Sequence, residues 1–317
     1  LETEKKVVEK NCALEPLVQL HVRGDKRTSF FGGGTTMACS ASTKCMKLVS
    51  HEKQGDRIVT VLSDGAGRIV RHTVVWHEGL EAVRVFTVFT NDTGAPLTLE
   101  MLSSANIGGL TPFFEEDAPG ALVIHRARSA WSAEGRISSN TAESLHLEPS
   151  WANHGLRVEK IGQKGSMPVR GYFPFGAVED QKTGVIWAMQ LACPSSWQLE
   201  FRRMDAGLAM MSGLADFDYG HWAKTLQPGE TFRTPEAFLT VGCGSLDAVS
   251  QRLLTIQMEN FAGKDRLPPV LFNEYCTTWG NPSEENLEKI VDCLRGKAID
   301  YLAIDCGWYG RPGVAWS

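Results

Sequence analysis

The pattern of hydrophobic and polar positions divides the chain into two parts. Up to about residue 260, apolar residues come in short runs, several of them alternating with polar residues, and clusters of Gly, Pro, Ser and Asp separate the runs. Alternation with a period of two is typical of a β-strand with one buried face. Because almost no long helical pattern interrupts these runs, residues 1–244 predict a large antiparallel β-sandwich, or β-supersandwich. The strand candidates are Val7–Val8, Leu17–Val22, Arg57–Leu62, Arg68–Trp76, Glu81–Thr90, Leu97–Leu102, Leu122–Ile124, Leu156–Ile161, Gly184–Gln190, Trp197–Phe201, Gly207–Leu214 and Ala237–Val241.

Two neighbouring pairs of these runs predict antiparallel partners. Arg57–Leu62 and Arg68–Trp76 are joined by Ser-Asp-Gly-Ala-Gly, a cluster of turn residues, and together they predict a hairpin. Val83–Phe89 and Leu97–Leu102 are joined by Asn-Asp-Thr-Gly. This second pair is the strongest antiparallel prediction in the chain.

The first convincing helical pattern follows the sandwich. Ser245–Phe261 carries apolar residues at the spacing of one helix face, and Ser245 or Asp247 is suited to cap its start. The polar stretch Ala262–Arg266 comes next. We therefore interpret residues 245–267 as a linker helix and loop between two domains.

The last fifty residues, 268–317, are the most informative part of the chain. They predict a strand, a helix and a second strand. Val270–Phe272 is an apolar run after two prolines, and Ala298–Ile304 is a second apolar run that ends at Asp305. A helix between two buried strands predicts a parallel pair. Such sheets carry their binding sites at the carboxyl ends of the strands.

The signals that bound this helix are local. Asn281 is predicted as the N-cap, Pro282 as the first helical residue and Glu284 as the partner in a capping box. Gly296 is suited to the left-handed position that ends a helix.

A parallel pair with one helix is not a complete domain, because one helix cannot cover both faces of a sheet. A closed eight-fold barrel needs about 250 residues. We therefore expect the chain to end inside a larger catalytic domain. The first residue, Leu1 rather than Met, agrees with a fragment or a processed chain.

Composition excludes several classes of protein. The hydrophobic share of 43% and the charged share of 22% are ordinary for a globular protein. The net charge is −5 without a basic stripe, so no nucleic-acid partner is expected. No run approaches the length of a membrane span, so no membrane partner is expected either.

The eight cysteines and eight histidines are scattered. No two cysteines are spaced as Cys-x-x-Cys, and a core of this size needs no disulfides, so we predict free buried thiols and no metal site. The sequence does not determine the compartment, although free thiols favour the cytoplasm over secretion.

Several motifs give the chain a resemblance to family 36 of the glycoside hydrolases, the microbial retaining α-galactosidases (melibiases) and their relatives. The likeness extends over most of the chain from about residue 170 and is diffuse before that position. The strand end with Asp, Gly and Trp is its most specific part. The motifs are Arg170–Phe175, Gly184–Trp187, Leu226–Glu230, Leu246–Arg252, Pro269–Asn273 with Tyr275, and Asp305–Gly310.

The resemblance implies a β-sandwich followed by a (β/α)8 TIM barrel, of which residues 268–317 would be the truncated start. It implies hydrolysis of terminal α-galactosides, such as raffinose-series sugars, by two aspartates on later barrel strands. The family's Lys-aromatic-Asp context for the nucleophile does not follow residue 268 here, so no catalytic residue is assigned. The family implies no metal or organic cofactor, and its members commonly form homo-oligomers.

Four residues are candidates for substrate binding through this resemblance. Asp305 matches the position that binds sugar hydroxyls, and an ionised carboxylate can accept hydrogen bonds from two of them. Trp308 offers a flat wall for the C–H face of a pyranose, and Tyr275 is expected in the same pocket. Cys306 stands where the family has a second Asp. Because a thiol is a weak hydrogen-bond partner, a related specificity such as α-N-acetylgalactosaminidase stays open.

Simpler interpretations exist for the same residues. Asp305 is also suited to cap a following helix, and Trp308 to pack in a core. Cys306 is most simply a packed thiol. Glu274 is either an acid in the site or one half of a salt bridge, and Trp279 is interpreted as loop packing.

The sequence leaves two other functions open. A non-catalytic carbohydrate-binding or scaffold protein is favoured if the natural chain ends at Ser317, because no catalytic carboxylate pair is then available. A galactosyl transferase of the same family shares every feature of this sequence.

Overall fold

The computed structural model divides the chain into two units, Leu1–Glu259 and Asn260–Ser317, which are described separately. The residues that it describes are 15–29, 31–110, 119–149, 155–165, 169–204, 207–258 and 268–309.

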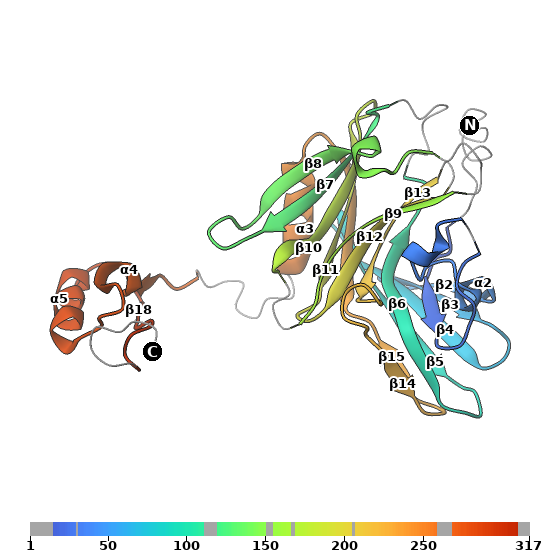
Figure 1. The fold of residues 1–317 in the computed structure, drawn as a ribbon, viewed down its shortest axis with the longest axis horizontal. Helices are drawn as coiled ribbons and strands as arrows, with labels where there is room; N and C mark the ends of the chain where they lie inside the picture. Colours follow the sequence, from blue (N-terminus) through green and yellow to red (C-terminus); the bar gives the residue numbers. More distant parts are fainter. Residues whose placement is uncertain are drawn as a thin grey trace. The chain divides into compact units, whose positions relative to one another are not determined.

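The first unit consists of two β-sheets whose strand pairs are antiparallel, as the alternating pattern predicts (Figure 1). The larger sheet has the order β2 (Lys47–Gln54), β3 (Arg57–Ser63), β4 (Arg68–Trp76), β5 (Ala82–Asn91), β16 (Glu236–Cys243), β11 (Val185–Ala192), β10 (Gly171–Asp180), β7 (Leu122–Ser129) and β8 (Arg136–Thr141), and β15 (Thr231–Arg233) also pairs with β5. The smaller sheet has the order β1 (Leu20–Val22), β6 (Leu97–Ile107), β13 (Gly207–Leu214), β12 (Trp197–Met204) and β9 (Leu156–Gln163), and β14 (Lys224–Leu226) also pairs with β6.

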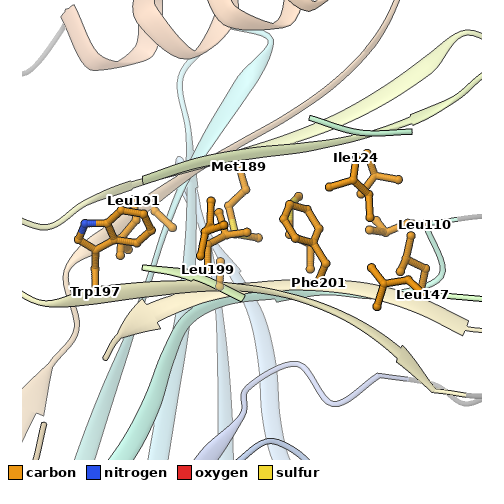
Figure 2. Packing of buried hydrophobic residues seen from close by; sticks show 14 of the residues in the cluster. Leu110, Ile124, Leu147, Met189, Leu191, Trp197, Leu199 and Phe201 are labelled. Atoms are coloured by element: carbon orange, nitrogen blue, oxygen red, sulfur yellow. The ribbon is translucent and has the colours of Figure 1, made fainter. Parts of the chain in front are cut away.

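The main core lies between these two sheets. Figure 2 shows Trp197, Leu199 and Phe201 of β12 pointing toward side chains such as Ile124 and Met189 of the facing sheet. All five side chains are fully buried. Alternate residues of β12 therefore fill the core, as expected for a sandwich.

The other face of β12 is also buried, although its side chains are polar. Gln198, Glu200 and Arg202 are almost completely inaccessible to solvent. The segment before β2, which contains η1 (Gly33–Thr35) and α2 (Ala41–Lys44), contributes to this covering, because the Thr36 hydroxyl donates to Glu200 at 2.7 Å. The alternating sequence of β12 did not reveal a second covered face.

The outer face of the larger sheet carries helix α3 (Leu246–Met258). Its apolar stripe, Val249, Leu253 and Ile256, packs against Ala188 and Phe238. The helix predicted at Ser245–Phe261 is confirmed up to Met258, and the remaining residues of that prediction lie outside the described ones.

One predicted hairpin is confirmed and the other is wrong. β3 and β4 pair through the turn at residues 64–67. β5 and β6, the strongest pair by sequence, belong to different sheets. Their connection crosses the sandwich, and the Asn91 side chain holds it by donating to the carbonyl oxygens of Ala95 and Leu226 at 3.0 and 2.9 Å. The edges of β5 are taken by β4, β15 and β16, so β6 cannot pair there.

Most other strand predictions match an observed strand within a few residues, but Val7–Val8 lies outside the described residues. The sequence did not single out β2, β8, β10, β14 or β15. The seven cysteines among the described residues are free, as predicted, but Cys243, Cys276 and Cys293 are exposed rather than buried.

The second unit contains a parallel pair, β17 (Leu271–Asn273) and β18 (Tyr301–Ala303), as predicted. The short helix α4 (Tyr275–Thr278) and the longer α5 (Glu284–Leu294) connect the two strands. The N-cap of α5 is Ser283, whose side chain accepts from the Asn286 N–H, so the predicted Asn281 cap is wrong. Gly296, just beyond this helix, has φ +73°, as predicted.

Within the described segments, no helix is long and apolar enough to cross a membrane. The same segments hold no group of three or more His, Cys, Asp or Glu side chains suited to a metal ion.

Candidate binding site at the ends of β17 and β18

The carboxyl ends of β17 and β18 bring Asn273 and Asp305 together. The parallel register pairs Asn273 with Ala303, two residues before Asp305. The Asn273 Nδ2 atom donates to Asp305 Oδ2 at 2.6 Å, and Asn273 Oδ1 accepts from the Tyr275 N–H at 2.9 Å. One amide therefore orients the Asp305 carboxylate and binds the backbone of Tyr275, the first residue of α4.

Asp305 keeps the capacity to bind a ligand. Asp305 is an exposed residue, and its Oδ1 atom accepts from the Cys306 N–H at 2.7 Å. Each carboxylate oxygen has two lone pairs, so one hydrogen bond per oxygen leaves room for ligand hydroxyls. An oriented, exposed carboxylate is suited to binding a polyol.

The Glu274 side chain positions the backbone of Asp305. It is fully buried, its Oε1 accepts from the Asp305 N–H at 3.0 Å, and its Oε2 accepts from the Thr278 hydroxyl. Its own N–H donates to the Ala303 carbonyl oxygen at 3.2 Å. Glu274 thus ties the segment after β18 to the segment after β17, which is a positioning role that the sequence did not reveal.

Gly307 allows the same two segments to approach closely. It has φ +107°, and a Cβ atom at this position would overlap the Gly280 carbonyl oxygen. Only glycine combines this backbone conformation with this lack of space. The Gly in the Asp-Cys-Gly-Trp motif is therefore explained by local packing.

Exposed tryptophans follow both strands of the parallel pair. Trp308 is 68% exposed and Trp279 is 72% exposed, so neither is a core or loop-packing residue. Trp308 contacts Tyr309 edge to face at a centroid distance of 5.2 Å, and Trp279 contacts Tyr275 in the same manner at 5.9 Å. Exposed indole rings are suited to stacking against a sugar ring.

Cys306, the residue after Asp305, is buried. It is 8% exposed, in agreement with a packed thiol. Desolvation and the neighbouring Cys306 thiol raise the pKa of Tyr275 and that of Tyr309. The thiol therefore lies close to both phenol groups and stands beside Asp305 without being open to solvent.

The chain was compared with protein families, known proteins and solved structures. No protein-family model matches the chain. It is 28% identical over 146 residues to the α-galactosidase Mel36A of Lactobacillus acidophilus, covering 44% of the chain and 20% of that protein. It is 27% identical over 136 residues to the α-galactosidase AgaA of Geobacillus stearothermophilus, covering 42% of the chain and 18% of that protein. The chain therefore spans about a fifth of the length of these relatives.

Solved structures share the fold over a larger part of the chain. The family 36 α-galactosidase AgaB of Geobacillus stearothermophilus superposes with a TM-score of 0.69 at 18% identity, covering 94% of this chain and 40% of that one. A variant of AgaA in complex with stachyose gives a TM-score of 0.66 at 19% identity, covering 93% of this chain and 39% of that one. Another AgaA variant was solved with raffinose.

Proposed function

We propose that this chain, which belongs to glycoside hydrolase family 36 and corresponds to the family's N-terminal portion, is part of a retaining α-galactosidase. The observation that carries the proposal is the exposed Asp305 carboxylate, which Asn273 and Glu274 orient at the ends of two parallel strands beside Trp308. The substrate class is that of terminal α-galactosides, as in the oligosaccharides bound by the solved relatives.

The domain plan follows from the same proposal. Residues 1–244 form the sandwich domain, residues 245–267 the linker helix and loop, and residues 268–317 the start of a (β/α)8 catalytic barrel. The parallel pair β17–β18 with α5 supports this plan, because it has the connectivity of one barrel repeat. The complete protein is proposed to form a homo-oligomer.

Within the site, the residues of this chain bind and orient the sugar. Asp305 accepts hydrogen bonds from two neighbouring hydroxyls, Trp308 stacks on the C–H face of the ring, and Tyr275 lines the pocket beside it. Glu274 and Asn273 are positioning residues for Asp305. Retention then requires two further carboxyl groups about 5 Å apart, one to attack the anomeric carbon and one to protonate the leaving oxygen. We expect these on later strands of the barrel and assign no described residue to either role.

Cys306 is proposed to modify specificity. A packed thiol beside Asp305 offers little to a sugar hydroxyl, so fewer strong hydrogen bonds are available on this side of the pocket. This observation keeps α-N-acetylgalactosaminidase activity, or transfer of galactose to another sugar, as the second candidate function.

The proposal is tested with the complete protein and para-nitrophenyl α-galactoside. Asp305→Ala removes charge-assisted hydrogen bonds worth about 1.5–3 kcal/mol each, so we expect a higher KM and a lower kcat. Asp300→Asn is the matched control, since Asp300 lies at the opposite end of β18, where it accepts from the Val270 N–H. A folded Asp305→Ala variant with unchanged kinetics would refute the site. An inactive wild-type protein would point to the second candidate function or to a non-catalytic carbohydrate-binding protein.

A further inference from the structure

Three side chains on neighbouring strands of the larger sheet form a continuous chain of hydrogen bonds. The His125 Nδ1 atom lies 2.9 Å from the Ser139 hydroxyl oxygen, and the His125 Nε2 atom lies 2.9 Å from Glu179 Oε2. His125 belongs to β7, Ser139 to β8 and Glu179 to β10, and these strands are adjacent in the sheet (Figure 1). A serine, a histidine and a carboxylate joined in this order are the side chains that serine hydrolases use.

The strand register places these three side chains, the Ser139 triad, on one face of the sheet. His125 is paired with Ser139 of β8 and with Ala177 of β10. Glu179 lies two residues beyond Ala177. Paired residues in antiparallel strands share a face, and so do residues two apart in one strand. Ala177 packs against the buried stripe of α3, so this is the face that carries the helix. Ile124, the residue before His125, points the other way into the core (Figure 2).

The hydrogen bonds determine which nitrogen of His125 carries the proton. An ionised carboxylate only accepts hydrogen bonds, so Nε2 carries the proton and donates to Glu179. Nδ1 of the neutral ring is then the acceptor, and the Ser139 hydroxyl donates to it. The two ring nitrogens exchange the roles that they have in chymotrypsin-type triads, but the proton still moves from the serine to the histidine.

Burial prepares His125 to act as a base. The residue is 4% exposed, and desolvation lowers the pKa of its ring, although Glu179 acts in the opposite direction. The ring is therefore neutral at neutral pH, with the Nδ1 lone pair directed at the Ser139 hydroxyl. A general base requires this protonation state and this contact.

The nucleophile of the triad is accessible. Ser139 is an exposed residue of β8, and β8 ends the larger sheet, so one edge of this strand has no strand partner among the described residues. Successive N–H groups of a strand alternate between its two edges. Either the Ser139 N–H or those of Ser138 and Asn140 therefore point to the open edge. Backbone N–H groups beside a nucleophile can stabilise the oxyanion that forms when it attacks a carbonyl carbon.

The surroundings of Ser139 favour an uncharged substrate. Ile137 lies two residues before Ser139, so it is on the same face, and it is 44% exposed. Its side chain offers apolar contact to a short acyl chain. The Glu179 carboxylate on the same face disfavours an anionic substrate, because like charges repel.

We propose that the Ser139 triad is a nucleophilic site that hydrolyses small, uncharged carboxylic esters. The Ser139 oxygen attacks the carbonyl carbon while its proton passes to His125 Nδ1. The alcohol leaves with that proton, and Ser139 carries the acyl group. A water molecule then gives a proton to His125 Nδ1 and attacks the acyl group, and that proton returns to the Ser139 oxygen as the carboxylic acid leaves. Ser139 and His125 are the catalytic residues, and Glu179 is a positioning residue.

The test is hydrolysis of para-nitrophenyl acetate by the 317-residue chain, with peptide mass spectrometry to locate the acetyl group. We expect repeated turnovers and transient acetylation of Ser139. Ser139→Ala should lower kcat/KM at least about a hundredfold, because no nucleophile remains for His125 to activate. Ser139→Cys should still be acetylated at residue 139, since a thiolate is also a nucleophile. Glu179→Gln should lower kcat at an unaltered KM, because an amide does not hold the proton on Nε2.

The matched control is Ser138→Ala. The Ser138 hydroxyl donates to Asn140 Oδ1 at 3.0 Å rather than to a histidine, so this variant should hydrolyse the ester like its parent. Because Ser139 is exposed, its replacement should leave urea unfolding nearly unchanged. An unaltered rate in Ser139→Ala, or acetyl groups on lysines alone, would overturn the proposal. The three side chains would then only hold β7, β8 and β10 together.

This activity does not depend on the proposed function. Para-nitrophenyl acetate contains no sugar, and para-nitrophenyl α-galactoside contains no ester. Loss of one activity without the other therefore shows which of the two proposals fails.

Discussion

Replacing Arg202 should destabilise the sandwich unit strongly, because this side chain neutralises buried carboxylates. Arg202 is fully buried on the polar face of β12. Its Nη1 atom donates to Glu200 Oε1 at 2.7 Å and its Nη2 atom to Glu15 Oε2 at 2.6 Å. The pKa of Arg202 is raised, because the charges of Glu15 and Glu200 outweigh the effect of burial, which by itself would lower it. The guanidinium is therefore charged in the folded protein at every pH of practical interest.

The expected magnitude follows from what each carboxylate keeps after Arg202→Met. Removing one partner of a buried ion pair typically costs about 3–5 kcal/mol, because a buried charge loses its compensation. Glu200 keeps the Thr36 hydroxyl at 2.7 Å and has the Lys160 ammonium at 3.8 Å. Glu15 keeps weaker amide donors, among them Gln19 Nε2 at 3.2 Å. We therefore expect the lower end of the range, about 3 kcal/mol.

The assay is urea unfolding monitored by tryptophan fluorescence, to which the fully buried Trp197 of β12 contributes. Arg57→Met is the matched control, since Arg57 forms an ion pair with Asp56 while its side chain is 48% exposed. Exposed pairs contribute at most about 1 kcal/mol. The double variant Arg202→Met, Glu200→Met should recover part of the loss. If Arg202→Met unfolds within about 0.5 kcal/mol of the wild type, the buried network does not have the role described here.

Three further outcomes are expected. Burial lowers the pKa of His72 from 6.5 to about 4, so below pH 6.5 the unfolded chain binds a proton that the folded chain does not. Stability should then fall by about 3 kcal/mol between pH 6.5 and pH 4, and His72→Gln should show a shallower fall in urea titrations. Gly307→Ala should destabilise the second unit by more than about 1 kcal/mol, because the added Cβ atom would overlap the Gly280 carbonyl oxygen. The variant should be digested faster by a protease. A rate of digestion equal to that of the wild type would contradict this expectation. Glu274→Gln should weaken the hydrogen bond from the Asp305 N–H to this side chain and raise KM for the galactoside about fivefold in the complete protein. An unaltered KM would contradict this expectation.

The alternating pattern identified most strands of the first unit but could not choose their partners. It predicted that β5 has one buried face and that a turn begins at Asn91, and the structure contains both. It paired β5 with β6 because the two are neighbours in the sequence. Pairing depends on which edges are already occupied, and β5 is bordered by β4, β15 and β16, most of which come from distant parts of the chain.

The polar face of β12 shows a second limit of sequence reasoning. An alternation of Trp, Leu and Phe with Gln, Glu and Arg is typical of a strand with one face in water. Here Glu200 and Arg202 are buried, because the chain before β2 covers that face and supplies Glu15 and Thr36 as partners. The burial of a polar residue cannot be inferred from the local sequence when its hydrogen-bonding partners are far away in the chain.

By itself, the sequence determined the sandwich, the parallel pair and the placement of Asp305 and Trp308 at a strand end, because periodicity and local motifs encode which face and which end of an element a residue occupies. Only the tertiary structure decided that Asn273 and Glu274 orient Asp305, that Cys306 packs under it, and that β5 and β6 belong to opposite sheets. The physical reason is the same in each case. Hydrogen bonds and burial depend on distances across the fold, and those distances are set by the packing of segments that are separated along the chain.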